Sequence, residues 1–211
     1  MAFFPFYMDI SDKVCLIVGG GKIALHKVKV LLQFNIKIHL VAPEICKEIY
    51  TLKNSAYETD LNIIKREFCQ EDILQADIVI AATDNHELNR YIANLCKNNN
   101  KLVNVVDDKE QSNFIFPAII KKKDLLLTIS TGGKSPMFTV VIKEELEKHI
   151  PEYYGDLIDI LGEVREYIKE FVPDGNMRKK IYMKLIACGK EAGRGLEQKE
   201  IEEIIGGLKE L

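Results

Sequence analysis

Two adjacent aspartates, Asp107 and Asp108, directly follow the apolar segment 101–106 (KLVNVV). In a parallel sheet, the residue that follows a buried strand lies at the edge where ligands bind. A carboxylate there could take a proton from a substrate as a general base. The same pattern suits a solvent-exposed turn carboxylate or a cap equally well, so the residues alone leave both interpretations open.

The glycine run Gly19–Gly21 is a second chemical pattern, placed between the apolar segment VCLIV and a stretch of helical spacing. Gly19, Gly21 and Ala24 match the dinucleotide-binding pattern GxGxxA. Gly19 permits a tight turn, and the missing side chain of Gly21 leaves room for a pyrophosphate at the N-terminus of the helix. The order strand, glycine turn, helix favours nucleotide binding over a purely structural turn.

The remaining cofactor contacts depart from this pattern in one place. The second apolar segment ends in HLVAPE, where the first acid is Glu44, beyond Pro43. No arginine stands there to bind a 2′-phosphate, which favours NAD over NADP. Thr83 and Asp84 close the fourth apolar segment, DIVIAAT, and are expected at the same edge. Asp84 and Asn85 also suit the N-cap of the helix that follows.

These candidate residues need a scaffold that brings the ends of several strands together. Up to about residue 108, apolar runs alternate with stretches of helical spacing. Strands are expected at 14–18, 36–42, 61–68, 77–83 and 101–106. Helices are expected at 21–34, from Pro43 onward, and at 85–99. An alternating βα series predicts a Rossmann-type parallel sheet with right-handed crossovers.

The pattern changes after the fifth strand. Two strand-like runs in FIFPAIIKKKDLLLTIS precede a helix in MFTVVIKEELEKHI, for which Ser135 suits the N-cap and Pro136 the first helical position. From Pro151 onward the sequence is helical and charged, with breaks at 173–175 and 193–195. The expected fold class is therefore α/β, with a small α+β region and a helical C-terminal tail after the sheet.

Composition argues against several classes of protein, among them membrane-spanning and nucleic-acid-binding ones. The chain has 211 residues and a formal net charge of −3, which gives no global attraction to nucleic acid or to an anionic membrane. No segment approaches the ~20 apolar residues of a membrane span. The five cysteines are odd in number and form no CxxC pair, and the four histidines lie apart. We therefore expect a cytoplasmic protein with buried, non-functional thiols and no fixed metal.

Three blocks, GGGKIALHK, AATDNHELN and NVVDDKEQSNFIFPAIIKKKDLLLTISTGGKSP, stand in this order. Together they resemble the precorrin-2 dehydrogenase family, the NAD-dependent enzymes of sirohaem synthesis that also form the N-terminal part of fused sirohaem synthases. The resemblance covers about residues 3–150, and the third block is its most specific part. It implies oxidation of precorrin-2 to sirohydrochlorin with NAD⁺ as hydride acceptor. The chain is too short for the methyltransferase module of the fused forms, so methylation is expected elsewhere.

The resemblance also implies a domain plan and site residues. The plan is an interlocked homodimer of chains with an NAD-binding Rossmann domain (1–113), a dimerisation and substrate-binding region (114–150) and a helical C-terminal domain (151–211). The family's essential carboxylate matches Asp107, whereas Asp108 is expected to start the turn that follows. By this resemblance, cofactor contacts fall on Lys22, Ile23, Pro43 and Glu44, and they join Gly19, Gly21 and Thr83, which the glycine pattern and the end of the fourth strand already indicate.

A polycarboxylate such as precorrin-2 requires cations and oriented N–H groups. The loop 130–136 (STGGKSP) offers hydroxyl groups, a flexible backbone, a lysine and a helix N-terminus. The candidate substrate ligands are Ser130, Thr131, Gly132, Lys134 and Ser135. Alternatively, the glycines only shape a strand-to-helix turn. The lysine run 121–123 fits a solvated turn better than a further anion site.

Two other functions stay open. A bifunctional dehydrogenase and sirohydrochlorin ferrochelatase would also insert metal without NAD. A non-enzymatic NAD-sensing module would need neither Asp107 nor the loop 130–136, so both features argue against it. The helical tail could close over the substrate cleft or only pad a dimer, and its sequence favours neither.

Overall fold

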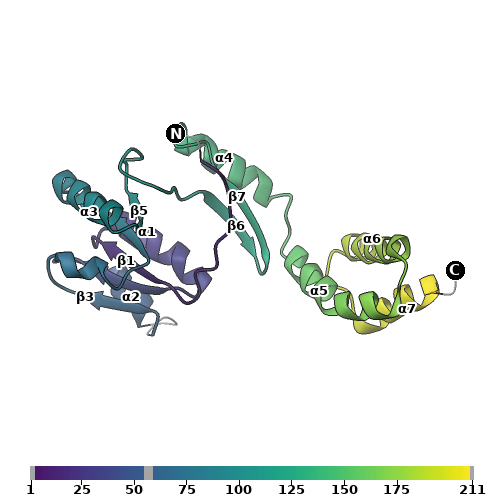
Figure 1. Cartoon of the computed structure of the whole chain (residues 1–211). Coiled ribbons are helices and arrows are strands. Elements are labelled where there is room, and N and C mark those ends of the chain that lie inside the picture. Colours follow the sequence, from purple (N-terminus) through teal and green to yellow (C-terminus); the bar gives the residue numbers. More distant parts are fainter. Residues whose placement is uncertain (1–2, 55–58, 210–211) are drawn as a thin grey trace. The chain divides into compact units, whose positions relative to one another are not determined.

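The computed structural model describes residues 3–54 and 59–209. The chain divides into two compact units, Met1–Phe116 and Pro117–Leu211. The first unit contains a parallel sheet with helices, and the second contains a small hairpin followed by helices (Figure 1). The finer division into three parts at residues 113 and 150 stays a prediction.

The first unit is built on a five-stranded parallel sheet in the order β3-β2-β1-β4-β5. Its strands are β1 (Val14–Val18), β2 (Lys37–Val41), β3 (Leu61–Ile64), β4 (Ile78–Ala81) and β5 (Leu102–Val105). The chain moves outward from β1 to β3 and then crosses to β4 on the other side of β1. The Rossmann-type order predicted from the βα alternation is confirmed, and its reversal beside β1 creates the crevice in which such sheets bind ligands.

Helices cover both faces of this sheet. On one face lie α1 (Lys22–Leu31), the short η1 (Leu32–Phe34) and α2 (Lys47–Lys53); on the other lie η2 (Gln70–Ile73) and α3 (His86–Asn98). In β1, Cys15 and Ile17 are buried in the first cluster, whereas Leu16 and Val18 are buried in the second. Burial on both faces is the reason that VCLIV is a continuous apolar run instead of an alternating one.

The prediction that a helix starts at Pro43 is wrong, because α2 begins at Lys47. The intervening residues pass over the glycine turn, where the Cys46 N–H donates to the Gly20 carbonyl at 2.9 Å. This backbone contact, made between distant parts of the chain, overrides the local preference of proline for a first helical turn. The third strand is also shorter than predicted and ends at Ile64.

A return segment, residues 112–114, runs back along the outer edge of β5. The Asn113 N–H donates to the Val103 carbonyl at 3.0 Å, and the Val103 N–H donates to Asn113 Oδ1 at 2.8 Å. Further along, the Val105 N–H donates to Ser112 Oγ at 2.9 Å. These bonds satisfy the exposed edge of β5 and hold both ends of the turn that carries the two aspartates.

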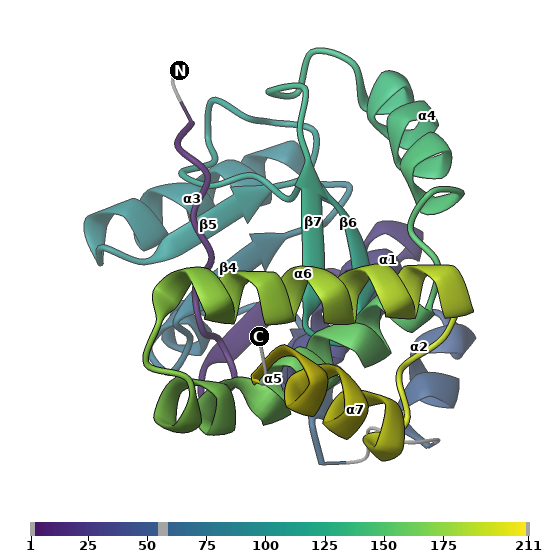
Figure 2. The same ribbon diagram turned by 90° about the vertical axis from the view of Figure 1, so that its right-hand side faces the viewer.

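The second unit begins with the antiparallel hairpin of β6 (Ala118–Lys122) and β7 (Leu125–Ile129), against which α4 (Pro136–Glu147) packs. The helices α5 (Tyr153–Phe171), α6 (Gly175–Ala192) and α7 (Gln198–Lys209) then share an apolar core. Figures 1 and 2 both show these three helices side by side. The two predicted breaks at 173–175 and 193–195 are confirmed. In the described part of the chain, no helix combines the length and apolar character required to cross a bilayer.

The lysine run 121–123 lies at the end of β6 and in the hairpin turn that follows, where Lys121 and Lys123 are exposed, as predicted for a solvated turn. Lys122 pairs with Glu152, and Lys123 Nζ lies 2.7 Å from Asp156 and 2.6 Å from Asp159. All three carboxylates come from α5 or its start, so these lysines tie the hairpin to α5. The sequence did not predict these ion pairs, because the acidic partners lie thirty or more residues further along the chain.

Candidate functional site

The first two glycines of the β1–α1 turn allow three chain segments to meet. Gly19 has φ +125°, and a Cβ built on it would lie 2.2 Å from the Ala82 carbonyl oxygen, just after β4. A Cβ on Gly20 would lie 2.2 Å from the Glu44 carbonyl oxygen, after β2. Both approaches are possible only without a side chain. The turn therefore touches the carboxyl ends of both strands that flank β1.

Gly21 has a different environment. Nothing lies within 4 Å of the position its Cβ would occupy, and its carbonyl accepts the Leu25 N–H at 3.0 Å. Gly21 is the N-cap of α1, and within the described residues no side chain caps this helix. Open space in front of uncapped N–H groups fits the pyrophosphate of a dinucleotide. Lys22 and Ile23, the first helical residues, are both exposed beside this space.

Pro43 and Glu44 lie in the segment after β2 and are exposed. Because the Glu44 carbonyl lies against Gly20, this segment borders the glycine turn. The structure thus brings together the residues predicted to contact a cofactor from β1 and β2. It also provides no acidic side chain at the end of β2 itself, in agreement with the sequence.

Thr83, after β4, is held by a buried asparagine that sequence patterns do not single out. Thr83 Oγ1 donates to Asn89 Oδ1 at 2.7 Å, and Asn89 Nδ2 donates to the Thr83 carbonyl at 2.9 Å. Asn89 is only 3% exposed. The helical spacing of the sequence could have indicated this role, because Asn89 falls on the same stripe of α3 as the buried Ile92 and Cys96. Asn85 caps α3, as predicted, by accepting the Glu87 N–H at 3.0 Å.

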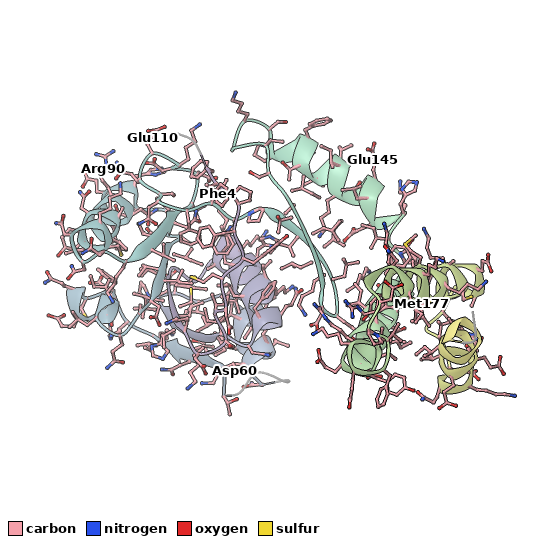
Figure 3. The ribbon with its side chains drawn as sticks, turned by 45° about the vertical axis from the view of Figure 1, so that its right-hand side comes forward. Phe4, Asp60, Arg90, Glu110, Glu145 and Met177 are labelled. Carbon is pink, nitrogen blue, oxygen red and sulfur yellow. The ribbon has the colours of Figure 1, made fainter. Side chains whose placement is uncertain are left out.

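Replacing Asn89 by Ala is expected to lower the free energy of unfolding by about 2 kcal/mol, because partly buried polar groups of Thr83 lose their partner. Urea denaturation measures this change. Arg90→Ala is the matched control on the outer side of α3 (Figure 3), where we expect a change within about 0.5 kcal/mol. An Asn89→Ala protein as stable as Arg90→Ala would contradict the role assigned to Asn89.

Asp107 lies in the turn directly after β5, next to the end of β4. The Val106 N–H donates to the Ala81 carbonyl at 3.0 Å, which keeps the start of the turn in register with β4. Asp107 is exposed and has φ +61°, in the left-handed region. Asp108 Oδ1 accepts the N–H groups of Glu110 and Gln111, each at 3.1 Å. Asp108 therefore shapes the turn, as predicted, and Asp107 is exposed at the carboxyl edge of the sheet.

Lys27 is a further charged residue near this edge that sequence patterns do not single out. It is half-buried on α1, and its Nζ lies 4.1 Å from the centroid of the Phe116 ring. Burial lowers the pKa of the Lys27 ammonium, whereas the negative charge of Asp107 raises it. In the sequence, the local feature that could have indicated partial burial of Lys27 is its place beside the buried stripe of Ala24, Val28 and Leu31.

The five predicted substrate ligands form one loop between β7 and α4, in the second unit. Thr131 Oγ1 accepts the Ser135 N–H at 3.2 Å and lies 3.1 Å from Thr139 Oγ1. Ser135 Oγ accepts the Phe138 N–H at 3.3 Å, which confirms the predicted cap. The hydroxyl groups of Thr131 and Ser135 thus hold the loop together.

The rest of this loop is open to a ligand. Ser130 Oγ accepts the Gly132 N–H at 3.1 Å, and Gly132, with φ +62°, has nothing within 4 Å of its Cβ position. Lys134 is exposed. The group best placed to meet an anion is therefore the Lys134 ammonium, and the open space beside Gly132 lets a ligand approach the loop closely.

The cysteines and histidines form no site in the part of the chain that the structure describes. Within 3–54 and 59–209, no group of three or more His, Cys, Asp and Glu is arranged to hold a metal ion. Cys15 and Cys96 are buried as expected, and burial raises the pKa of the Cys96 thiol to about 11. Cys69 differs from that expectation because it is exposed.

Comparison with known proteins gives the family. A profile of the putative NAD(P)-binding family matches residues 6–118, and a profile of the sirohaem biosynthesis protein central region matches residues 124–149. The siroheme synthase of Thioalkalivibrio sulfidiphilus is 35% identical over 186 residues, which cover 88% of this chain and 37% of that protein. The siroheme synthase of Mannheimia succiniciproducens is 36% identical over 171 residues, which cover 81% and 35%.

The chain thus spans little more than a third of the length of these relatives. A solved structure, SirC, precorrin-2 dehydrogenase, is 25% identical and matches with a TM-score of 0.74 over 99% of this chain and 100% of that one. The first profile covers more than half of the 211 residues. The resemblance inferred from the three sequence blocks is therefore confirmed: the chain belongs to the putative NAD(P)-binding family and continues into a sirohaem biosynthesis central region.

Proposed function

We propose that this protein is an NAD-dependent dehydrogenase that oxidises precorrin-2 to sirohydrochlorin in sirohaem biosynthesis. The observation that carries the proposal is the likeness to SirC, precorrin-2 dehydrogenase, over nearly the whole length of both chains. The likeness to siroheme synthases supports the same pathway.

The cofactor residues have distinct parts in this proposal. Gly19 lets the β1–α1 turn approach β4, and Gly21 with the first N–H groups of α1 receives the pyrophosphate. Pro43 and Glu44 border the adenosine side, and Thr83 lies at the end of the neighbouring strand. When bound, the nicotinamide accepts the hydride that leaves the substrate. The open Gly21 position and the uncapped α1 terminus support this assignment.

Asp107 is the general base of the proposed reaction. Oxidation of precorrin-2 removes a hydride from carbon, which goes to NAD⁺, and a proton from a second position, which goes to a base, while one new double bond forms. A carboxylate exposed at the end of β5 can accept that proton from a large macrocycle. Asp108 is committed to backbone N–H groups in the turn, which favours Asp107 as the base.

The loop between β7 and α4 is proposed to bind the carboxylates of precorrin-2. Lys134 supplies a cation, and Gly132 offers backbone that a ligand can approach closely. Ser130, Thr131 and Ser135 maintain the loop conformation through the hydrogen bonds described above.

We also propose that the protein is a homodimer that pairs through α4. Met137 and Phe138 of this helix are 73% and 57% exposed, and Val140 and Val141 are exposed as well. An apolar helix face of this kind is typical of an interface between identical chains.

The double variant Phe138→Asp/Val141→Asp is expected to reduce the molar mass measured by light scattering from that of a dimer to that of a monomer, because paired carboxylates would be buried at the interface. Lys143→Gln, which lies on α4 away from the stripe of Phe138 and Val141, is the control and should stay dimeric. A monomeric wild-type protein, or a double variant that still dimerises, would refute pairing through α4.

Turnover tests the function itself. The purified protein is incubated without oxygen with precorrin-2 and NAD⁺, and the absorbance of NADH and of sirohydrochlorin is followed. Both are expected to rise together, in equal amounts. Absence of NADH formation, with the protein shown to be folded, would overturn the proposed function.

A further inference from the structure

We propose that the groove between α5 and α6 is a further ligand site, which binds tetrapyrrole polycarboxylates, the chemical class of the substrate and product of the proposed reaction. The choice of this ligand class rests on the proposed function. The shape and charge of the groove do not, and its occupation can be measured without turnover.

The groove is formed by one face of each of two helices that lie side by side (Figures 1 and 2). It has a volume of about 800 Å³. The residues of α5 that line it recur at helical spacing over three turns, and those of α6 lie one turn apart. None of them belongs to the glycine turn, to the turn that carries Asp107 or to the loop between β7 and α4, so the groove is separate in its residues from the candidate site.

The floor of the groove is apolar and is held by the core of the helical region. Leu161 and Tyr182 pack against the core cluster that α5, α6 and α7 share, and they line the groove together with Ile158. Ile168 and Ile181, each adjacent in sequence to a residue of the groove, are fully buried in the same cluster. Both walls of the groove are therefore fixed by packing on their other side.

The charged side chains that line the groove are all cationic, namely Arg165, Lys169 and Arg178. Lys169 pairs with Glu166 at 2.7 Å, but that pair is exposed and its carboxylate does not line the groove. Arg178 Nη1 donates to the carbonyl groups of the two residues that follow α5, at 3.1 and 3.0 Å, and these neutral acceptors leave its charge uncompensated. Within 3–54 and 59–209, no carboxylate forms an ion pair with either arginine.

An apolar floor bordered by cations is complementary to a flat apolar ring that carries carboxylates on its rim. Precorrin-2 and sirohydrochlorin are ligands of this kind. A guanidinium group can bind a carboxylate through two parallel hydrogen bonds, and the groove offers two such groups, Arg165 and Arg178. A Cβ on Gly162 would meet nothing within 4 Å, so a ring can approach the backbone of α5 closely there.

The neighbouring groove between α6 and α7 provides a comparison within the same helical region. Its volume is about 660 Å³, and the charged residues that line it are of both signs, namely Lys180, Lys184 and Glu203. This second groove could hold a ligand of similar size, but it lacks the uniform positive charge. Its lysines therefore serve as matched controls.

The test uses uroporphyrin, a stable porphyrin with acetate and propionate side chains, added to the whole protein without NAD⁺. Amide ¹H–¹⁵N NMR follows the signals of Gly162 and Tyr182, because the ring current of a bound porphyrin shifts the signals of nearby amides. We expect both signals to shift with uroporphyrin concentration until they saturate, and the titration gives the dissociation constant.

The double variant Arg165→Gln/Lys169→Gln is expected to raise this dissociation constant by about tenfold, since two charge-assisted contacts are lost. The double variant Lys180→Gln/Lys184→Gln, in the other groove, should stay within about twofold of wild type. All four side chains are exposed, so both proteins should fold like the wild type.

Three results would overturn the inference. The first is an unmoved Gly162 signal while signals of the loop between β7 and α4 shift, and the second is equal affinity in wild type and Arg165→Gln/Lys169→Gln. The third is tighter binding of a glutamate-rich peptide at the same signals, which would identify an acidic protein segment as the occupant. Turnover of precorrin-2 without porphyrin binding at Gly162 would overturn this inference alone, whereas binding without turnover would overturn the proposed function alone.

Discussion

Asp107→Asn is expected to lower kcat for precorrin-2 oxidation by about a hundredfold to ten-thousandfold, because an amide cannot accept the proton that leaves the substrate. Asparagine is the appropriate replacement because Asp107 has φ +61°, and asparagine tolerates the left-handed region better than most other residues. Stopped assays for NADH measure kcat, and fluorescence quenching measures NAD⁺ affinity, which should stay within about twofold. Alanine would add backbone strain of about 1 kcal/mol and confuse the two effects.

Asp108→Asn is the matched control for this experiment. Its side-chain oxygen can still accept the N–H groups of Glu110 and Gln111, so the turn should persist and kcat should stay near the wild-type value. If Asp107→Asn retained full turnover, or if the Asp108 variant lost as much, Asp107 would not be the base.

Gly19→Ala is expected to destabilise the first unit by about 3 kcal/mol or more, since it combines a left-handed backbone with a severe clash. The new Cβ would lie 2.2 Å from the Ala82 carbonyl oxygen, and relief would require movement of the chain after β4. Urea denaturation gives the free energy of unfolding. An unfolding free energy equal to that of wild type would contradict the close approach of Gly19 to the Ala82 carbonyl.

Gly21→Ala is expected to weaken NAD⁺ binding and to leave stability nearly unchanged, in contrast to Gly19→Ala. Its Cβ meets nothing within 4 Å, so the free energy of unfolding should change by no more than about 1 kcal/mol, the cost of alanine at an N-cap. NAD⁺ affinity should fall tenfold or more, because the methyl group occupies the space in front of the α1 terminus. Unchanged affinity in a stable Gly21→Ala protein would show that the pyrophosphate does not approach there.

Much of the fold could be predicted because it is encoded locally. The run VCLIV is apolar throughout since β1 is buried on both faces, and the Ser135–Pro136 start of α4 follows from capping chemistry within a few residues. The error at Pro43 has a non-local cause. The segment that follows β2 is drawn over Gly20, and no local rule for proline describes that contact.

The geometry of the candidate site could be predicted at single residues that end a strand, and less so where two residues distant in sequence must meet. Gly19 and Asp107 stand at the ends of strands, and their sequence context marks them. Asn89 and Lys27 lie inside helices of ordinary composition, and their partners, Thr83 and Phe116, come from other segments. Only the folded chain brings such pairs into contact.

The return segment along β5 has a consequence for the motions of the protein. Because it bonds to β5 across only about ten residues, closing the turn costs little chain entropy. The amides of Val103 and Val105 are bonded to this segment, while the next residue is bonded to β4. We therefore expect the backbone on either side of Asp107 to be displaced mainly when this edge of the sheet opens, which slow hydrogen exchange of the Val103 and Val105 amides would report.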